Sequence, residues 1–211
     1  MKKVNICIGR FQPFTAGHYK CVEEAWKKKH LPTVICMINV PESKVDQRHP
    51  FPSTMLADVY SDLFSNDSKI ADLIPVKSAN IVAIADELRK NGYEIGSWTC
   101  GTDRLADYTK MSSKYHDQAG LADDFEMIEV PRTDEDISAT KARNCLLNDD
   151  REGFDKMIPD GSVFDTDMLY QTLKDQIDKV YKVSERFNRL SRRLMLERRI
   201  RRLERLIHRH F

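Results

Sequence analysis

The spacing of apolar residues predicts strands that alternate with helices over roughly the first 150 residues. Apolar and polar positions alternate over residues 3–8, as in a short strand, and helical spacing follows over residues 17–29. The same two periods give further strands over 33–40, 72–76, 94–100 and 125–130, and further helices over 53–64, 81–89, 105–115 and 138–147. This alternation is typical of an α/β fold with a doubly wound, Rossmann-like parallel sheet.

The pattern changes after about residue 160. Apolar residues recur at steps of three and four from Leu169 to Leu194, and the stripe then shifts by about one residue. We expect either two helices or one helix bent near Met195. The chain is therefore divided into a domain over 1–160 and a basic, amphipathic helical extension over 161–211.

The net charge of +1 conceals a strong asymmetry along the chain. Residues 182–211 hold eleven Lys or Arg and three Glu, a net charge of +8, so the other 181 residues carry −7. Three roles are open for this basic segment. It could associate with a second copy, bind nucleic acid or an acidic partner, or lie on an anionic membrane. We favour a homo-oligomer formed through the C-terminal helices, do not favour nucleic acid, and expect no membrane association.

The five cysteines are scattered and include no CxxC pair, so neither a zinc site nor a disulfide framework is indicated. Free thiols favour a cytoplasmic location. The longest nearly unbroken apolar run, Val34–Val40, is too short to cross a bilayer, and the N-terminal segment does not resemble a secretory signal.

The first motif with chemical content is GRFQPFTAGH, over Gly9–His18, between the first strand and the first helix. The N-terminus of a helix presents free N–H groups and the positive end of the helix dipole, which together bind phosphate. Gly17 permits close approach of the backbone, and the ring of His18 can donate to a phosphate oxygen. Arg10 could hold a phosphate with its forked guanidinium.

The second motif is ISATKAR, over Ile137–Arg143, and it follows the last predicted strand. Ser138 and Thr140 offer hydroxyl donors at the start of a helix, and Lys141 and Arg143 add positive charge one turn later. Two helix N-termini that face one crevice would hold a triphosphate.

Together these motifs resemble the (H/T)xGH and (I/M)SxTxxR loops of the nucleotidylyltransferase superfamily, and the resemblance spans Lys3–Pro159. The string GRFQPF followed by xGH is similar to nicotinamide mononucleotide adenylyltransferases of the archaeal and phage-like branch, with Thr15 where that branch has His. The resemblance implies transfer of AMP from ATP to nicotinamide mononucleotide with release of pyrophosphate. It also implies Mg²⁺ on the triphosphate with few protein ligands, so no metal-ligating residue is assigned.

The resemblance also assigns roles to individual residues. It places His18 at the transition state, Thr15 near the α-phosphate and Arg143 among the catalytic residues. The residues expected to contact the nucleotide are Gly9, Arg10, Phe11, Gly17, His18, Asp103, Arg104, Ser138, Thr140, Lys141 and Arg143. Apart from the resemblance, Arg48 and Trp98 are candidates for contact with the substrate, although a Trp at such a position more often lies in the core than stacks on a base.

Other functions remain open at this stage. The enzyme could use ATP or CTP with another phosphorylated acceptor, such as phosphopantetheine or a phospho-alcohol. The chain could instead be a non-catalytic protein that binds nucleotide or nucleic acid. The string KMSSK over Lys110–Lys114 is close to a loop of class I aminoacyl-tRNA synthetases, but Met111 is in phase with a predicted helix face, which favours a helix.

Overall fold

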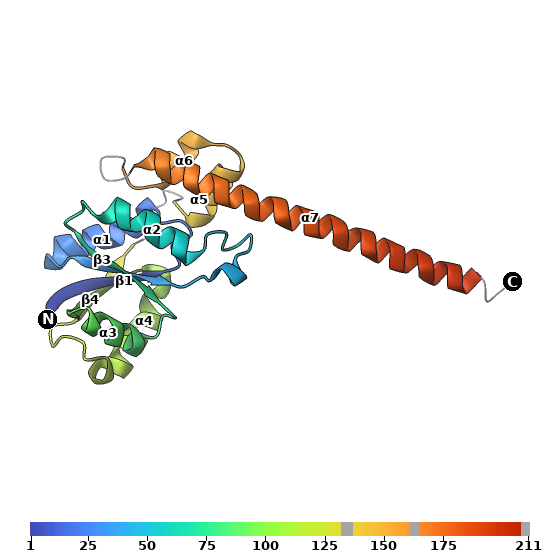
Figure 1. Ribbon diagram of the computed structural model, residues 1–211. Coiled ribbons are helices and arrows are strands. Elements are labelled where there is room, and N and C mark those ends of the chain that lie inside the picture. Colours follow the sequence, from blue (N-terminus) through green and yellow to red (C-terminus); the bar gives the residue numbers. More distant parts are fainter. Residues whose placement is uncertain (132–136, 161–164, 208–211) are drawn as a thin grey trace.

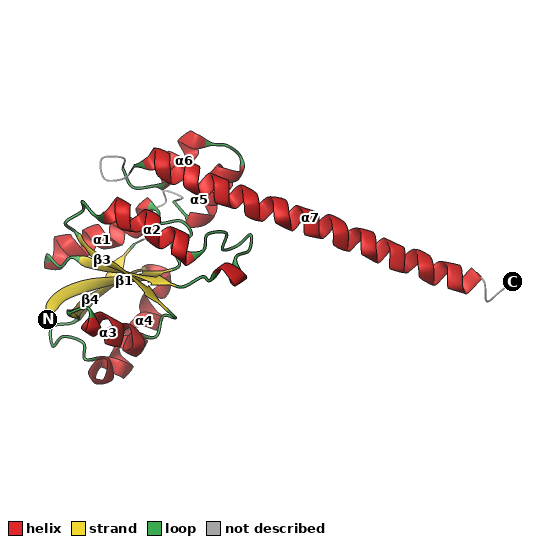
Figure 2. Cartoon of the chain, viewed as in Figure 1, coloured by secondary structure: helices red, strands yellow, loops and turns green. Residues whose placement is uncertain are grey.

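Five parallel strands form one sheet in the order β3-β2-β1-β4-β5 (Figures 1 and 2). The computed structural model describes residues 1–131, 137–160 and 165–207, and within its last helix it describes no side chain in 186–194 or 197–207. The strands are β1 (Lys2–Gly9), β2 (Thr33–Ile38), β3 (Ile70–Val76), β4 (Tyr93–Gly101) and β5 (Glu126–Val130). This arrangement confirms the predicted α/β fold with a parallel sheet.

The direction of winding reverses beside β1. From β1 the chain moves outward to β2 and β3, and it then returns to place β4 on the other side of β1. The carboxyl ends of β1 and β4, at Gly9 and Gly101, therefore lie on adjacent strands. In open α/β sheets, the crevice outside the strand ends at such a reversal is where ligands bind.

Helices cover both faces of the sheet (Figure 2). One face packs against α1 (Ala16–Lys29), α2 (Ser53–Phe64), α5 (Ala139–Leu147) and α6 (Arg151–Met157), and the other against α3 (Ile81–Lys90) and α4 (Thr102–Ala119). Two apolar clusters, one on each side, result because side chains alternate across each strand; in β1, Cys7 belongs to the first cluster while Val4 and Ile6 belong to the second.

Most predicted elements agree with the observed ones to within one to four residues at their ends. The prediction missed α6 and a short 3₁₀ helix over Glu42–Lys44. The prediction that Lys110–Lys114 is helical is confirmed, because this segment lies inside α4. The five cysteines are free thiols, and Cys7, Cys36 and Cys100 are buried as expected.

The last element, α7, differs from the prediction. It is a single helix over Thr166–Ile207, so the expected division or bend near Met195 is wrong. The start of α7 packs with the preceding domain, because Leu169, Leu173 and Ile177 are buried in the first apolar cluster. Beyond them the helix runs away from the sheet (Figure 1), and Val183, Met195 and Leu196 are exposed.

In the described part of the chain, no helix combines the length and the apolar character needed to cross a membrane.

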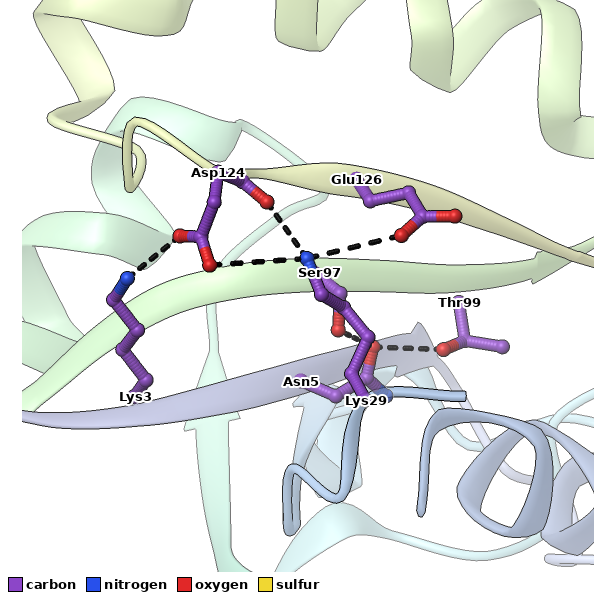
Figure 3. Close-up of polar contacts among 7 residues, drawn as sticks. All are labelled: Lys3, Asn5, Lys29, Ser97, Thr99, Asp124 and Glu126. Atoms are coloured by element: carbon purple, nitrogen blue, oxygen red, sulfur yellow. Dashed lines mark hydrogen bonds and ion pairs between the residues drawn. The ribbon is translucent and has the colours of Figure 1, made fainter. Parts of the chain in front are cut away.

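A buried polar cluster joins the three central strands (Figure 3). The Asn5 side chain is fully buried; its amide donates to the Thr33 hydroxyl at 3.1 Å, and its carbonyl oxygen accepts from Ser97 at 2.9 Å and from Thr99 at 2.7 Å. Closer to the start of β1, an exposed ion pair joins Lys3 to Asp124 at 2.6 Å. The buried cluster fixes how β1 lies between its neighbours, because each of its polar groups is satisfied only by the others.

Replacing Asn5 by Ala should therefore destabilise the fold. We expect a loss of about 2–4 kcal/mol in the free energy of unfolding, because three buried hydroxyls lose their partner. Denaturant unfolding of the variant would measure it. Lys3→Ala is the control, and its effect should be much smaller since water screens an exposed pair. Equal losses in the two variants would contradict this assignment.

Candidate functional site

Tyr60 of α2 holds the loop between β1 and α1 through two hydrogen bonds to the loop backbone. The Tyr60 hydroxyl donates to the carbonyl oxygen of Phe11 at 3.0 Å and accepts from the backbone N–H of Phe14 at 2.7 Å. The Phe11 backbone has a φ of 49°, a left-handed conformation that costs energy for a residue with a side chain. The two hydrogen bonds of a fully buried phenol hold the loop in this conformation.

Gln12 in the same loop is buried and contacts two other segments. Its side-chain amide donates to the carbonyl oxygen of Phe51 at 2.6 Å, and its side-chain oxygen accepts from the backbone N–H of Phe51 at 3.1 Å. Its backbone carbonyl oxygen accepts from Nη1 of Arg143, in the second motif, at 2.5 Å. The structure therefore brings both sequence motifs together at Gln12.

The imidazole of His18 is fixed in orientation at the start of α1. The backbone N–H of Thr15 donates to Nδ1 of His18 at 3.0 Å, so the neutral ring carries its proton on Nε2. The ring also packs edge-on against Phe11, with 5.1 Å between ring centroids. The hydrogen bond and the ring packing together fix the direction in which the Nε2–H group of His18 can donate.

Thr15, which is expected near the α-phosphate from the sequence, packs its side chain against His18. Its side chain is only 2% exposed, and its hydroxyl lies 3.0 Å from Nδ1 of His18. Thr15 is the residue that precedes α1, and its backbone N–H and hydroxyl group both contact Nδ1 of His18 and so orient the ring. It is therefore a positioning residue here.

The second motif forms the N-terminus of α5, beside that of α1. Ser138 caps the helix by accepting from the backbone N–H of Lys141 at 3.1 Å. Thr140 is exposed, and its hydroxyl accepts from Nη2 of Arg143 at 3.1 Å. A Cβ atom at Gly17 would lie 3.8 Å from the backbone oxygen of Ile137, so the two helix starts are close neighbours.

Four basic side chains gather at this edge of the sheet: Arg10, Arg48, His49 and Arg143. Burial and then the charge of Arg10 lower the pKa of His49, and Arg48 and Arg143 lower it further, while Asp46 raises it. Burial likewise lowers the pKa of Arg143, which still remains charged at neutral pH. A concentration of positive charge beside two helix N-termini is suited to a bound polyphosphate.

Of four further residues predicted to contact the nucleotide, two are exposed and two pack against each other at the end of β1. Asp103 and Arg104 lie exposed in the first turn of α4, at the carboxyl end of β4. Gly9 leaves room for the ring of Phe11, which would lie 2.9 Å from a Cβ atom there. Phe11 is itself 2% exposed, so its side chain packs in the loop and does not face a nucleotide as predicted.

The prediction that Trp98 contacts a substrate is wrong for this structure. Its side chain has no exposed surface and stacks on Tyr108, with 4.2 Å between ring centroids. It belongs to the apolar cluster between the sheet and α3 and α4. Arg48, in contrast, is exposed at the site, as the predicted role requires.

Sequence reasoning missed Gln12 and Tyr60. Gln12 lies within the quoted motif, and a polar residue between two phenylalanines could have been noted as a buried hydrogen-bonding group. Tyr60 has no signal in the sequence, because its partners are 46 and 49 residues away along the chain.

The donors at this site are suited to phosphate and not to a metal ion. Over the described residues, no group of three or more His, Cys, Asp or Glu side chains could hold a metal. Guanidinium and backbone N–H groups bind anions. A Mg²⁺ ion would fit here only as part of a nucleoside triphosphate complex, with phosphate oxygens and waters as its ligands.

The fold and the site together define an α/β nucleotide-binding domain. The profile of the cytidylyltransferase-like family matches residues 6–145, which is more than half of the chain. The chain belongs to the cytidylyltransferase-like family. A comparison with curated protein sequences finds no match.

Among solved structures, the chain is similar to Plasmodium falciparum nicotinic acid mononucleotide adenylyltransferase complexed with NaAD, with 14% identity and a TM-score of 0.51. That match covers 83% of this chain and 98% of the other. The same Plasmodium falciparum enzyme complexed with APC matches with 15% identity, a TM-score of 0.47 and coverage of 83% and 98%. At these identities the first match supports the fold.

The cationic environment of His49 leads to a prediction about pH. In the ligand-free protein its lowered pKa keeps the ring neutral at pH 7. A polyphosphate among Arg10, Arg48 and Arg143 would replace repulsion by attraction and raise that pKa, so binding would take up a proton. We therefore expect pyrophosphate to bind more tightly as the pH falls from about 7.5 to 5.5.

Calorimetric titration of the wild type and of His49→Gln would measure this effect. The variant should lose part of the pH dependence, whereas His116→Gln, on α4, should retain all of it. Identical pH profiles for wild type and His49→Gln would exclude His49 from the anion site.

Proposed function

We propose that this protein transfers AMP from ATP to nicotinamide mononucleotide and releases pyrophosphate. Its membership in the cytidylyltransferase-like family and the arrangement of its two motifs support a nucleotidyl transfer. The observation that carries the proposal is the hydrogen bond from Arg143 to the Gln12 carbonyl oxygen, since it joins the two phosphate-binding loops in one site.

In this mechanism the acceptor phosphate attacks the α-phosphorus of ATP in line. A new P–O bond forms to the acceptor, and the bond from the α-phosphorus to the bridging oxygen of pyrophosphate breaks. The protein supplies no nucleophile. It holds the reacting groups in line and stabilises the charge that develops on the phosphoryl oxygens.

The proposed roles of the residues follow from their positions. Nε2 of His18 donates to the α-phosphoryl oxygen in the transition state. Arg143, Thr140 and the N-terminus of α5 hold the β- and γ-phosphates, and Lys141 adds positive charge there. Arg10 joins them, and Asp103 and Arg104 contact the ribose or a phosphate. A Mg²⁺ ion bound to ATP would neutralise part of the triphosphate charge, with phosphate oxygens and waters as its ligands.

The choice of acceptor rests on two supports. One is the resemblance of the first motif to nicotinamide mononucleotide adenylyltransferases. The other is the similar fold of an enzyme named for nicotinic acid mononucleotide. Our second candidate is transfer from ATP or CTP to another phosphorylated acceptor, and a pyrophosphate-release screen across such acceptors distinguishes the two. Because all five cysteines are free thiols, we propose a cytoplasmic location.

Replacing His18 by Ala should lower the turnover number by about a hundred-fold or more, because one preorganised donor to the transition state is lost. The rate of pyrophosphate release at saturating ATP and acceptor measures it. His116→Ala on α4 is the control, and its turnover should match that of the wild type. A His18→Ala enzyme with unchanged turnover would remove His18 from the mechanism.

We also propose that the protein forms a homo-oligomer through the C-terminal helices. The support is the exposure of Val183, Met195 and Leu196 on a helix that leaves the body of the protein. Exposed apolar residues on an extended helix favour association. The opposite charges of the helix end and of the remaining chain also favour contact between copies.

The mass of the full chain in solution tests this proposal. In light scattering at 0.5 M salt we expect the wild type to be at least a dimer. The double variant Val183→Glu, Leu196→Glu should be a monomer, whereas Lys179→Glu should keep the wild-type mass. A monomeric wild type that binds duplex nucleic acid with a steep salt dependence would replace this proposal with the nucleic-acid alternative.

A further inference from the structure

The segment over residues 46–51 lies between the first motif and α7. On one side Phe51 is held by both polar atoms of the Gln12 side chain. On the other side Gln176 of α7 donates to the carbonyl oxygen of Pro50 at 3.2 Å. The segment that carries Arg48 and His49 to the site is thus anchored to two elements that are distant in sequence.

Within this segment Asp46 fixes the backbone. Its Oδ1 atom accepts from the backbone N–H of Arg48 at 2.9 Å and from that of His49 at 2.6 Å. The same oxygen lies 3.5 Å from Nδ1 of His49. These contacts shape the turn locally, but they do not fix where the turn lies relative to the rest of the site.

A second contact from α7 holds the exposed end of the turn. The side-chain amide of Gln47 donates to the hydroxyl of Ser184 at 3.0 Å. Gln176 and Ser184 are separated by about two helical turns, so one rigid helix holds the segment at two points. Between them lies Tyr181, whose phenol is close enough to Arg143 to influence its pKa, after the larger effect of burial.

We propose that α7 is a positioning element of the active site. Ser184 and Gln176 hold the 46–51 segment so that Arg48 and His49 face the arginines of the two phosphate loops. This inference rests on the proposed function, and it assigns to Arg48 a contact with the acceptor, in line with the substrate contact expected from the sequence. It assigns part of α7 to the substrate site and not to a separate extension.

The kinetic consequence is a change in binding with little change in chemistry. His18, Arg143 and the two helix N-termini do not move when Ser184 loses its hydroxyl, so kcat should stay within about two-fold. A displaced Arg48 binds the acceptor less well, and KM for the acceptor should rise roughly three-fold to ten-fold, the range that the loss of one neutral hydrogen bond supports.

A double-mutant cycle on Gln47 and Ser184 tests the contact itself. Ser184→Ala and Gln47→Ala should each raise KM for the acceptor, and the double variant should be no worse than either one, because both remove the same hydrogen bond. Ser184→Thr keeps a hydroxyl and should restore the wild-type KM. Val183→Ala, at the exposed neighbouring position, is the matched control and should leave KM unchanged.

Two further readouts do not depend on turnover. Amide hydrogen exchange at residues 48 and 49 should be faster in Ser184→Ala than in Val183→Ala. The dissociation constant for inorganic tripolyphosphate should rise several-fold in the same variant, because a displaced Arg48 no longer adds its charge to those of Arg10 and Arg143. If no acceptor supports turnover but these two changes occur, the proposed function fails while the positioning role of α7 stands.

Other results would overturn the inference. Additive effects in the cycle would mean that Gln47 and Ser184 act separately. An unchanged KM, or a fall in kcat with KM preserved, would mean that α7 does not position the acceptor site. Faster exchange with unchanged tripolyphosphate affinity and KM would leave the contact with a purely structural role.

Discussion

The site depends on the buried side chain and carbonyl group of Gln12. Each half of this residue is satisfied by a different segment: the amide by Phe51, and the backbone oxygen by Arg143. Burying such groups without partners would cost several kcal/mol, so the three segments are stable only together. In the function we propose, the backbone assigned to phosphate binding would therefore be in place before a nucleotide arrives, as electrostatic stabilisation of a transition state requires.

The two ends of the sheet have different roles. At the amino end, Lys3 pairs with Asp124, and Lys29 pairs with both Asp124 and Glu126 (Figure 3). These contacts join the start of β1 and the end of α1 to the start of β5. At the carboxyl end, the loops hold basic groups whose charges repel one another until an anion binds. Stability is thus supplied mainly by the buried centre of the sheet, whereas the carboxyl edge gathers positive charge that a bound anion would balance.

The local pattern of apolar and polar residues was sufficient to predict most strands and helices and to find the two motifs. Periodicity and helix-start signals depend only on residues that are close together in the sequence. It failed where a partner is remote in sequence. Tyr60 looks like any apolar helix residue until its bonds to Phe11 and Phe14 are seen. The sequence also left two positions open for Trp98, the core and a contact with the substrate, and only the packed structure shows that its side chain is enclosed by the core. It gave no sign that the Thr15 hydroxyl lies against His18. Exposure of a side chain is a property of the packed chain, which no motif encodes.

The same argument applies to the packing of α7 beyond residue 160, where the sequence predicts the start of the helical extension. Composition changes there, since the chain becomes rich in charge and loses glycine and proline, but composition does not define a domain. A domain is defined by shared buried surface, and Leu169, Leu173 and Ile177 share theirs with α5 and α6. The shift in the apolar stripe near Met195 predicted a bend because a packed helix must keep one face to the core. Past Tyr181 the helix does not pack on the sheet, so the shift requires no bend and α7 continues straight.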